Sequence, residues 1–277
     1  MSEAAQHSAT LGPAAAASAS RGMRPAMISK VAGWLLVLAL LVAWEASARL
    51  GLVKSQSWPP FTGVLRAVWD GMLTGELLGV LLSTMLRMLK GFLIGSAIGV
   101  VLGLLIATVP LLRRFLSIVI EAVRPLPIPA IVPPLILFLG IDDGLKVTVV
   151  ALAVAFPVLI NTIGGVDNID GTLLQTARTF RKTRLETMTS IILPSALPTI
   201  LAGMRISLGL AFVTTIVAEM IAGSAGVGYF IMVTQYGMRP DQMYAAVICL
   251  AALGYGLNWA FVSIERRLVG WDQRQDD

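Results

Sequence analysis

The residues that invite a chemical interpretation form a basic segment in the third quarter of the chain. Residues 173–200 contain two prolines and four basic side chains, and they lie between segments apolar enough to cross a membrane. The basic side chains are Arg178, Arg181, Lys182 and Arg184. Clustered cations of this kind bind a protein partner or the anionic headgroups of a membrane surface. The residues themselves leave both uses open.

The chain lacks the residue sets that catalysis requires. It contains no G-x-x-x-x-G-K-[ST] phosphate-binding loop, so we expect no nucleotide hydrolysis on this polypeptide. The single histidine, His7, and the single cysteine, Cys249, are too few for a zinc site. We therefore expect no metal and no cofactor on this chain, and any energy for work has to come from another chain.

The composition is that of a membrane protein. Of the 277 residues, 56% are hydrophobic and 13% are charged, whereas soluble domains carry about 25% charged residues. The net charge of +5 is spread over short loops between apolar segments and forms no single patch. This distribution argues against a nucleic-acid partner and favours a lipid bilayer.

Apolar segments of about 20 residues predict the membrane-spanning helices. We expect an all-α polytopic membrane protein with about six spans. They are placed near residues 31–49, 86–109, 127–141, 145–163, 200–222 and 244–264. The third contains Pro127, Pro129, Pro133 and Pro134, which predict a broken helix buried in protein.

The segments outside the spans complete the expected organisation. Residues 1–30, rich in Ala and Ser, predict a disordered tail, and residues 31–277 the transmembrane domain. A cleaved signal peptide is the rival interpretation of the start of the chain, but the apolar run that follows is longer than a signal core. Residues 55–83 are too polar to cross and predict short helices at the outer interface.

The basic residues also predict the orientation in the membrane. With the tail inside, the inner segments hold 14 of the 21 Lys and Arg residues. Because cytoplasmic loops carry an excess of Lys and Arg, this bias favours both termini in the cytoplasm.

Small residues mark one face of the second span. Gly91, Gly95, Gly99 and Gly103 recur at four-residue intervals, and such a face lets another helix approach closely in lipid. The approaching helix belongs either to the same subunit or to a second one, and the spacing does not distinguish them.

The basic segment itself has a fair 3.6-residue periodicity. It predicts one short amphipathic helix over residues 173–186, within a loop of residues 167–198. Pro194 and Pro198 are expected to end this helix and to force an abrupt turn.

This segment resembles the cytoplasmic coupling loop of bacterial ABC importer permeases. The family motif reads Glu-Ala-Ala, three residues, Gly, nine residues, Ile, one residue, Leu-Pro. Arg181 stands at the glycine position and a glutamine replaces the glutamate, while the spacing is intact. The residues that match the motif or flank it, and that would contact the ATPase, are Gln175, Thr176, Ala177, Arg178, Arg181, Lys182, Ile191, Leu193 and Pro194.

Other stretches extend the resemblance over residues 60–270. "VRPLPIPAIVPPLILFLGI", "FPVLINTIGGVDNID" and "AEMIAGSAGVGYFI" are similar to permeases that import nitrate, sulfonates, taurine and related small molecules. The resemblance implies a bacterial inner-membrane subunit that carries a small anion and binds no cofactor itself. Its implied partners are a cytoplasmic ABC ATPase dimer holding ATP and Mg, a second permease copy, and an extracytoplasmic substrate-binding protein.

Polar residues inside the spans are candidates for a translocation path, because a charge at the bilayer centre is usually retained for a reason. Glu219 resembles the family's glutamate in the same "AEM" context. It is either a structural carboxylate, bonded to backbone or to Thr214 or Thr215, or a contact for substrate. Thr214, Thr215 and Asn161 either line the path or bond across helices.

A transporter or membrane scaffold that works without nucleotide is the alternative. An ion-coupled transporter of this kind typically has an internal repeat with matched broken helices. The sequence has one proline-broken span and no counterpart in its other half, which favours the ABC permease.

Overall fold

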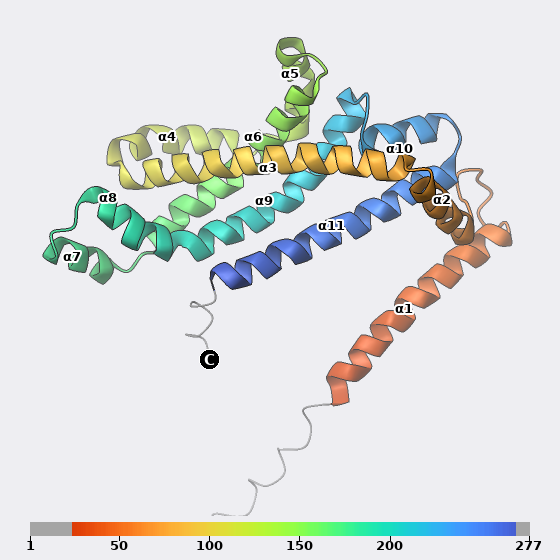
Figure 1. The fold of residues 1–277 in the computed structure, drawn as a ribbon, viewed down its shortest axis with the longest axis horizontal. Coiled ribbons are helices and arrows are strands. Elements are labelled where there is room, and N and C mark those ends of the chain that lie inside the picture. Colours follow the sequence, from red (N-terminus) through yellow and green to blue (C-terminus); the bar gives the residue numbers. More distant parts are fainter. Residues whose placement is uncertain (1–23, 270–277) are drawn as a thin grey trace, which may run out of the picture. The chain divides into compact units, whose positions relative to one another are not determined.

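The computed structural model describes residues 24–269, so most of the expected tail lies outside the described residues. Residues 24–30, also expected in the tail, form the start of helix α1 (Arg24–Arg49). All regular structure in the described range is helical (Figure 1). The chain divides into two compact units, one ending at Thr62 and the other beginning at Gly63.

The first unit is α1 with the loop that follows it. Trp44 lies with its ring centroid 5.4 Å from those of Trp58 and Phe61, and its indole N–H donates to the carbonyl of Pro59. The carboxylate of Glu45 accepts from Arg49 and from the backbone N–H of Thr62. The loop is therefore folded back onto the end of α1 by aromatic and polar contacts.

The second unit contains the remaining helices. In chain order they are α2 (Phe61–Leu73, which begins at the boundary), α3 (Glu76–Thr108), α4 (Pro110–Val123), η1 (Ile128–Ile131), α5 (Val132–Leu139), α6 (Asp143–Asp167), α7 (Gly171–Thr179), α8 (Arg184–Thr187), η2 (Met188–Ile192), α9 (Leu193–Ala222), α10 (Val227–Tyr236) and α11 (Pro240–Leu268).

The described residues contain five helices long and apolar enough to cross a membrane. They are residues 32–49 of α1, α3, α6, the run 184–222 and α11. The pair 110–123 and 128–139, bent by 91°, is a sixth if it forms one broken span. The structure thus agrees with an all-α polytopic membrane protein of about six spans, as the sequence predicted.

The centre of the second unit is α6, which packs against α3 on one side and α9 on the other (Figure 1). The four glycines of α3 face α6 of the same chain. A Cβ at Gly91 would lie 2.6 Å from the Val150 side chain, and one at Gly103 would lie 2.6 Å from that of Thr162. Close backbone approach replaces side-chain interdigitation along this seam.

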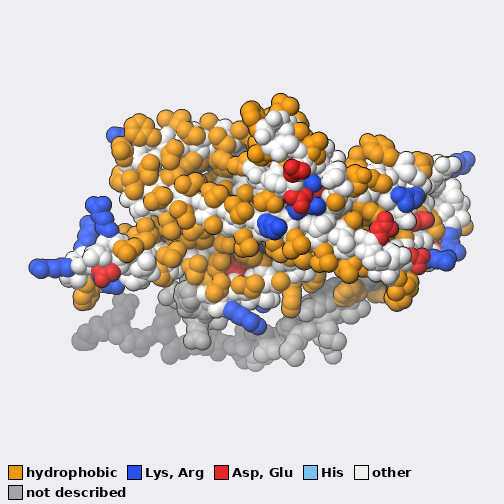
Figure 2. All heavy atoms as spheres, turned by 45° about the horizontal axis from the view of Figure 1, so that its top comes forward, with side chains coloured by type: hydrophobic (Ala, Val, Ile, Leu, Met, Phe, Trp, Pro, Cys, Tyr) orange, Lys and Arg blue, Asp and Glu red, His pale blue; other side chains and the backbone are white. Residues whose placement is uncertain are grey.

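Apolar side chains cover the outside of the second unit as well as its core. Figure 2 shows hydrophobic side chains over most of the visible face, with Lys and Arg side chains at the end where α7 and α8 lie and at several other places. Such a surface requires lipid or a protein partner, because exposed apolar patches of this extent are rare on soluble monomers.

The third span differs from its prediction. A break is present, but it lies between α4, which the sequence did not predict, and the segment η1–α5. This chain alone does not bury the end of the helix, since Leu137 and Phe138 are 85% and 83% exposed, so the expected burial in protein is not met within one chain. Prolines lie in the first turns of η1 and α5, where they are tolerated because the backbone N–H that they lack would be unpaired anyway.

The start of the fifth span is also corrected. Pro194 and Pro198 do not end a helix, because α8 continues through the π-helical turn η2 into α9. The N–H of Leu193 donates to the carbonyl of Met188, five residues earlier. This wider turn shifts the hydrogen-bond register where Pro194 lacks an N–H, and the chain stays helical. The span predicted at 200–222 therefore begins much earlier.

Likewise, α3 begins at Glu76 instead of near residue 86. The segment 76–83, expected at the interface, is the first part of this helix. Only α2 remains as a separate short helix there.

Candidate functional site

The basic segment forms two short helices instead of the single one predicted. α7 begins after Asp170, whose carboxylate accepts from the backbone N–H of Thr172 at 2.8 Å. This hydrogen bond lowers the pKa of Asp170 below its usual value. α7 is thus fixed at its start by an N-cap, the arrangement that satisfies an otherwise unpaired helix N–H.

The turn after α7 explains why one helix became two. The N–H of Lys182 donates to the carbonyl of Ala177 at 3.1 Å, and that of Arg181 to Arg178 at 3.0 Å, which is a Schellman motif. Arg181 has a φ of +53°, a conformation that glycine adopts easily and other residues adopt at a cost of about 1–2 kcal/mol. The turn therefore forms with arginine at the position where the family motif has glycine.

α8 begins with a second cap. The Thr183 hydroxyl accepts from the N–H of Glu186, and the Glu186 carboxylate accepts from the N–H of Thr183 at 2.7 Å, a capping box. The ammonium of Lys182 donates to the Ser190 hydroxyl at 2.8 Å. The loop is rigid although it is exposed.

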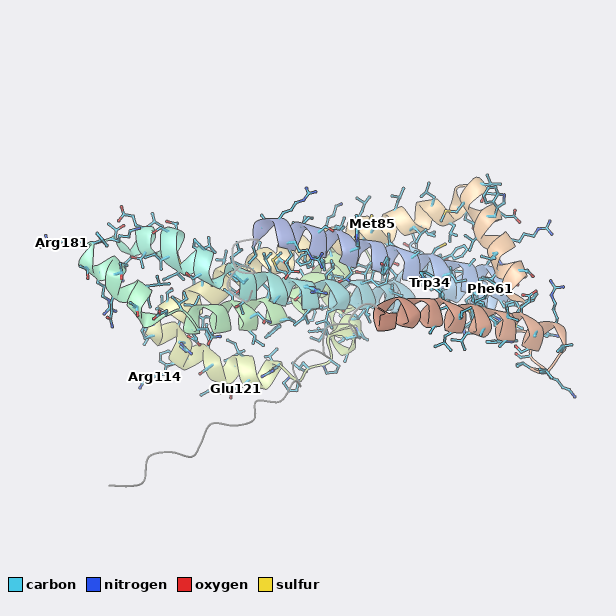
Figure 3. All side chains as sticks on the ribbon, turned by 90° about the horizontal axis from the view of Figure 1, so that it is seen from below. Trp34, Phe61, Met85, Arg114, Glu121 and Arg181 are labelled. Carbon is cyan, nitrogen blue, oxygen red and sulfur yellow. The ribbon has the colours of Figure 1, made fainter. Side chains whose placement is uncertain are left out.

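The exposed surface of this loop combines charge and apolar groups. Phe180 and Leu185 are largely exposed beside the basic side chains, and Figure 3 shows Arg181 at the far end of the loop. Of the motif residues, Ala177 is buried and Ile191 and Leu193 are half-buried. Gln175, Thr176, Arg178, Arg181, Lys182 and Pro194 are exposed. A rigid, basic projection with apolar side chains at its tip is suited to docking a protein.

A second polar site lies at the other end of α9. Glu219 is fully buried, and its carboxylate accepts from the Thr84 hydroxyl at 2.9 Å, from the Arg87 guanidinium at 3.0 Å and from the N–H of Gly228 at 3.0 Å. The expected partners Thr214 and Thr215 are not used. The Thr215 hydroxyl donates instead to the carbonyl of Ala211.

Arg87 extends this cluster to two more elements. Its Nε donates to Asp143 at the start of α6 at 2.7 Å, and its NH1 also donates to the carbonyl of Ala225 at 3.2 Å. Lys146, 1% exposed, lies 3.4 Å from the same Asp143 carboxylate. Two cations thus balance two carboxylates, and the cluster joins α3, α6, α9 and the loop before α10. Removing one partner of such a buried pair costs about 3–5 kcal/mol.

Two glycines let the loop before α10 close onto α9. Gly226 has a φ of +104°, and a Cβ there would collide with the Glu219 carboxylate. A Cβ at Gly228 would collide with the carbonyl of Ile216. Both glycines are therefore required by close approach, and Gly226 also by its positive φ.

The four candidate path residues do not form one site. Asn161 packs against Gly203 and donates to the carbonyl of Pro157. Gly203 and Glu219 are separated by about 24 Å along α9, at 1.5 Å per residue. Thr214, Thr215 and Glu219 are buried within the chain.

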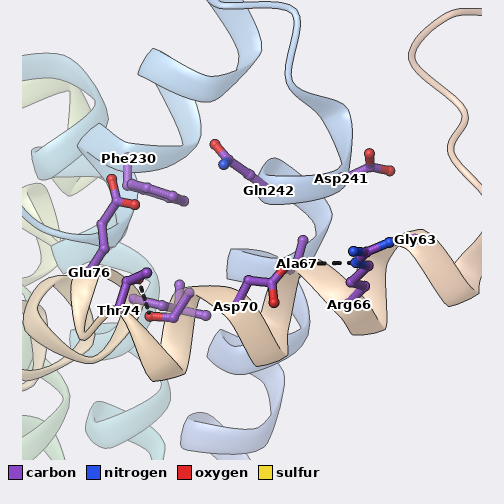
Figure 4. Close-up of a pocket in the computed structure, with 12 residues that line it drawn as sticks. Gly63, Arg66, Ala67, Asp70, Thr74, Glu76, Phe230, Asp241 and Gln242 are labelled. Atoms are coloured by element: carbon purple, nitrogen blue, oxygen red, sulfur yellow. Dashed lines mark hydrogen bonds and ion pairs between the residues drawn. The ribbon is translucent and has the colours of Figure 1, made fainter.

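A pocket opens at the end of the second unit away from the α7–α8 loop (Figure 1 and Figure 4). It has a volume of about 450 Å³ and lies between α2, the start of α3, α10 and the start of α11. Three carboxylates line it, from Asp70, Glu76 and Asp241, together with Arg66, which lies 3.8 Å from Asp70.

Comparison with known proteins now identifies the family. Residues 99–270, more than half of the chain, match the family described as binding-protein-dependent transport system inner membrane component. The chain belongs to this family. The permease has no cluster of three or more metal-ligating side chains within the described residues.

Curated relatives cover nearly the whole permease. It is 35% identical to the aliphatic sulfonates transport permease protein SsuC of Escherichia coli (strain K12), over 88% of this chain and 92% of that protein. It is 33% identical to the SsuC protein of Bacillus subtilis (strain 168), over 86% and 87%. It is 30% identical to the taurine transport system permease protein TauC of Escherichia coli (strain K12), over 58% of this chain and 59% of that protein.

A solved structure supports the fold. The permease superposes on a chain of the MetNI methionine ABC transporter in an inward-facing conformation with a TM-score of 0.61 and 20% identity, covering 72% of this chain and 99% of that chain. The fold is thus that of a type I ABC importer permease.

Sequence reasoning located the exposed basic segment that forms α7 and α8 but missed the partners of Glu219. Arg87 and Lys146 are among the seven Lys and Arg residues that the orientation count leaves to the outer segments, so the sequence did not single them out as partners of Glu219. Their position inside long apolar helices was the available signal, because intramembrane charges usually pair with one another.

Proposed function

We propose that this permease imports small organic sulfonates. The observation that carries the proposal is the 35% identity to an aliphatic sulfonate permease over nearly the full length of both chains. Taurine, itself a sulfonate, is the substrate class named for a further relative. Nitrate and aromatic carboxylates are the less favoured anions.

The permease works as a pair of copies with two kinds of partner. A dimer of cytoplasmic ABC ATPases, which hold ATP and Mg, docks on the α7–α8 loop. A substrate-binding protein docks at the opposite, extracytoplasmic end and delivers the anion there. In the proposed arrangement both termini are cytoplasmic, an orientation that the distribution of Lys and Arg supports.

The geometry supports a direct mechanical route between the two ends. Helix α8, η2 and α9 form one continuous run from Arg184 to Ala222, which is about 58 Å long at 1.5 Å per residue. Its first residues belong to the α7–α8 loop, and Glu219 near its last residues is hydrogen-bonded to α3 and α10 and is linked to α6 through Arg87. A displacement of the loop by the ATPase is therefore transmitted to the cluster as a movement of one rigid body.

Glu219 is assigned a structural role in this mechanism. Its carboxylate is satisfied by cationic, hydroxyl and backbone donors of the same chain, and an anion would be repelled by it. The translocation path is then formed between the two permease copies.

Uptake into proteoliposomes tests the proposal. The permease is reconstituted with its ATPase and with the binding protein encoded beside it, and import of a radiolabelled alkanesulfonate is measured with and without ATP. ATP-dependent sulfonate uptake is expected. Uptake by the permease alone, without any ATPase, would instead favour a nucleotide-independent transporter.

The substrate class is tested independently on the binding protein. Thermal stabilisation by alkanesulfonates, and less or none by nitrate or benzoate, is the expected result. Stabilisation by nitrate alone would contradict the sulfonate assignment and leave the permease assignment intact.

A further inference from the structure

A bidentate ion pair joins α4 to the end of α6 beside the coupling loop. Arg113 Nη1 donates to Asp167 Oδ1 and Arg113 Nη2 donates to Asp167 Oδ2, both at 2.7 Å. This parallel, two-bond geometry is the strongest arrangement of an arginine with a carboxylate. Asp167 is the last residue of α6 and precedes the N-cap of α7, Asp170, by three residues.

The pair is not explained by helix-end electrostatics. Arg113 lies in the first turn of α4 and Asp167 in the last turn of α6. A cation is unfavourable near a helix N-terminus and an anion is unfavourable near a C-terminus. Each charge is therefore unfavourable in the dipole of its own helix, and the attraction between Arg113 and Asp167 compensates for this cost.

α4 has few other attachments. None of its described side chains is buried, and Arg113–Asp167 is the one hydrogen-bonded or ionic contact between α4 and another helix among the described residues. Figure 3 shows Arg114 and Glu121 on the outward side of the same helix.

The other end of α4 leads into the bend before α5. There Ile128 of η1 and Val132 of α5 pack with Val149 of α6 and Ala222 of α9. One end of α4 is thus held at the coupling-loop end of α6, and the other runs into a segment that contacts the far ends of α6 and α9.

We propose that Arg113 and Asp167 are positioning residues that make α4 follow the coupling loop. Resting on the proposed function, the pair carries a displacement of the α7–α8 loop along α4 to the bend at residues 124–131. The loop then acts on the membrane segment by two routes, directly through α9 and through α4. Neither side chain contacts substrate or nucleotide.

Transport stoichiometry in the assembled transporter provides the first test. Asp167→Asn and Arg113→Ala are expected to lower sulfonate imported per ATP hydrolysed by about fivefold or more, the usual range of coupling between sites. The double exchange Arg113→Asp with Asp167→Arg, which also suits both helix dipoles, is expected to restore it. Arg114→Ala, the matched control, should have no effect. Unchanged stoichiometry in both single variants, or no recovery in the exchange, would overturn the proposal.

A second measurement is independent of substrate and partners. Spin labels are placed at Ser117→Cys on α4 and Gln175→Cys on α7 of the full-length permease in nanodiscs, with Cys249→Ala removing the native thiol. A narrow distance distribution is expected for the native pair, a broad one for Asp167→Asn, and a narrow one again in the exchange. An unchanged distribution in Asp167→Asn would refute the attachment of α4, whereas failure of sulfonate uptake by the native transporter would count only against the proposed function.

Discussion

The α7–α8 loop and the Glu219 cluster place charge in opposite environments. In the loop, four basic side chains are exposed and the backbone is held by caps and a Schellman turn. In the cluster, two cations and two carboxylates hold four elements together, and Glu219 is fully buried. Exposed charges contribute little to stability, whereas a buried charge left without its partner is strongly destabilising. The charges of the loop are therefore available to a partner, while those of the cluster are paired within the fold.

The sharpest test of this contrast is the loss of the buried carboxylate. Glu219→Ala leaves the Arg87 guanidinium without its buried partner, and we expect a loss of about 3–5 kcal/mol of stability. Thermal unfolding of the purified permease in detergent measures it. Glu121→Ala, at an exposed position of α4, is the matched control and should unfold with the native protein. Equal unfolding temperatures for both variants would contradict the structural role of the cluster.

Charge reversal in the loop should weaken binding of the ATPase and leave the stability of the permease almost unchanged. We expect the triple variant Arg178→Asp, Arg181→Asp, Lys182→Asp to weaken ATPase binding by about 2–5 kcal/mol. If the ATPase surface that docks on the basic loop is acidic, the new aspartates would face carboxylates of the same sign. Co-purification of the ATPase with the permease measures this, and the unfolding temperature of the permease alone should change little. Normal assembly and normal stimulated ATP hydrolysis in this variant would contradict docking at the loop.

The α3–α6 seam gives an intermediate effect. A Cβ at Gly95 would collide with the carbonyl of Ala151, whereas none would meet any atom within 4 Å at Gly79 of the same helix. Gly95→Ala is expected to cost about 1–3 kcal/mol, as overpacking usually does, and Gly79→Ala to be neutral or slightly stabilising. Unfolding of the two variants in parallel is the measurement. Equal behaviour would show that the seam has room to separate.

The contrast between loop and cluster also explains what could be read from the sequence. The loop is local in sequence, so its spacing and basic residues predicted its place even though the turn at Arg181 was not foreseen. The cluster joins residues 84, 87, 143 and 219. Arg87 and Glu219 are 132 positions apart in the sequence, so no short motif predicts their hydrogen bond. Long-range pairing of this kind depends on how α3, α6 and α9 pack.

Helix boundaries were missed for a related reason. Proline was expected to end the basic helix, but a proline ends a helix only where the preceding turn cannot adapt. Here the π-helical turn Met188–Ile192 lets the helix continue past Pro194. The start of α3 was missed because Glu76 and the neighbouring polar residues suggested a segment at the membrane interface. In the structure the helix begins at Glu76 and continues without a break into the apolar stretch.

Substitution of Arg181 distinguishes the contribution of its backbone conformation from that of its charge, with a smaller expected effect. Arg181→Gly removes the strain of a left-handed arginine and is expected to stabilise the turn by about 1 kcal/mol. Arg181→Lys keeps both the charge and the strain, and should not stabilise. Protection of the amides of Arg181 and Lys182 from hydrogen exchange measures the turn directly. Faster exchange in the glycine variant would show that the arginine side chain, and not the Schellman geometry, holds the turn.

The smallest expected effect is the pH dependence of the α7 cap. The folded-state pKa of Asp170 is lowered by its hydrogen bond from Thr172, so its stabilisation of α7 is present above the unfolded-state pKa and is lost as the pH falls through the folded-state pKa. A spin label at Gln175→Cys, with Cys249→Ala, should become more mobile on acidification. Asp170→Asn caps the helix without titrating, so its label should lack this part of the pH response while Glu186 and the other carboxylates still titrate. Identical pH profiles in the two proteins would show that α7 is held by Ala177 packing beneath it and not by its cap.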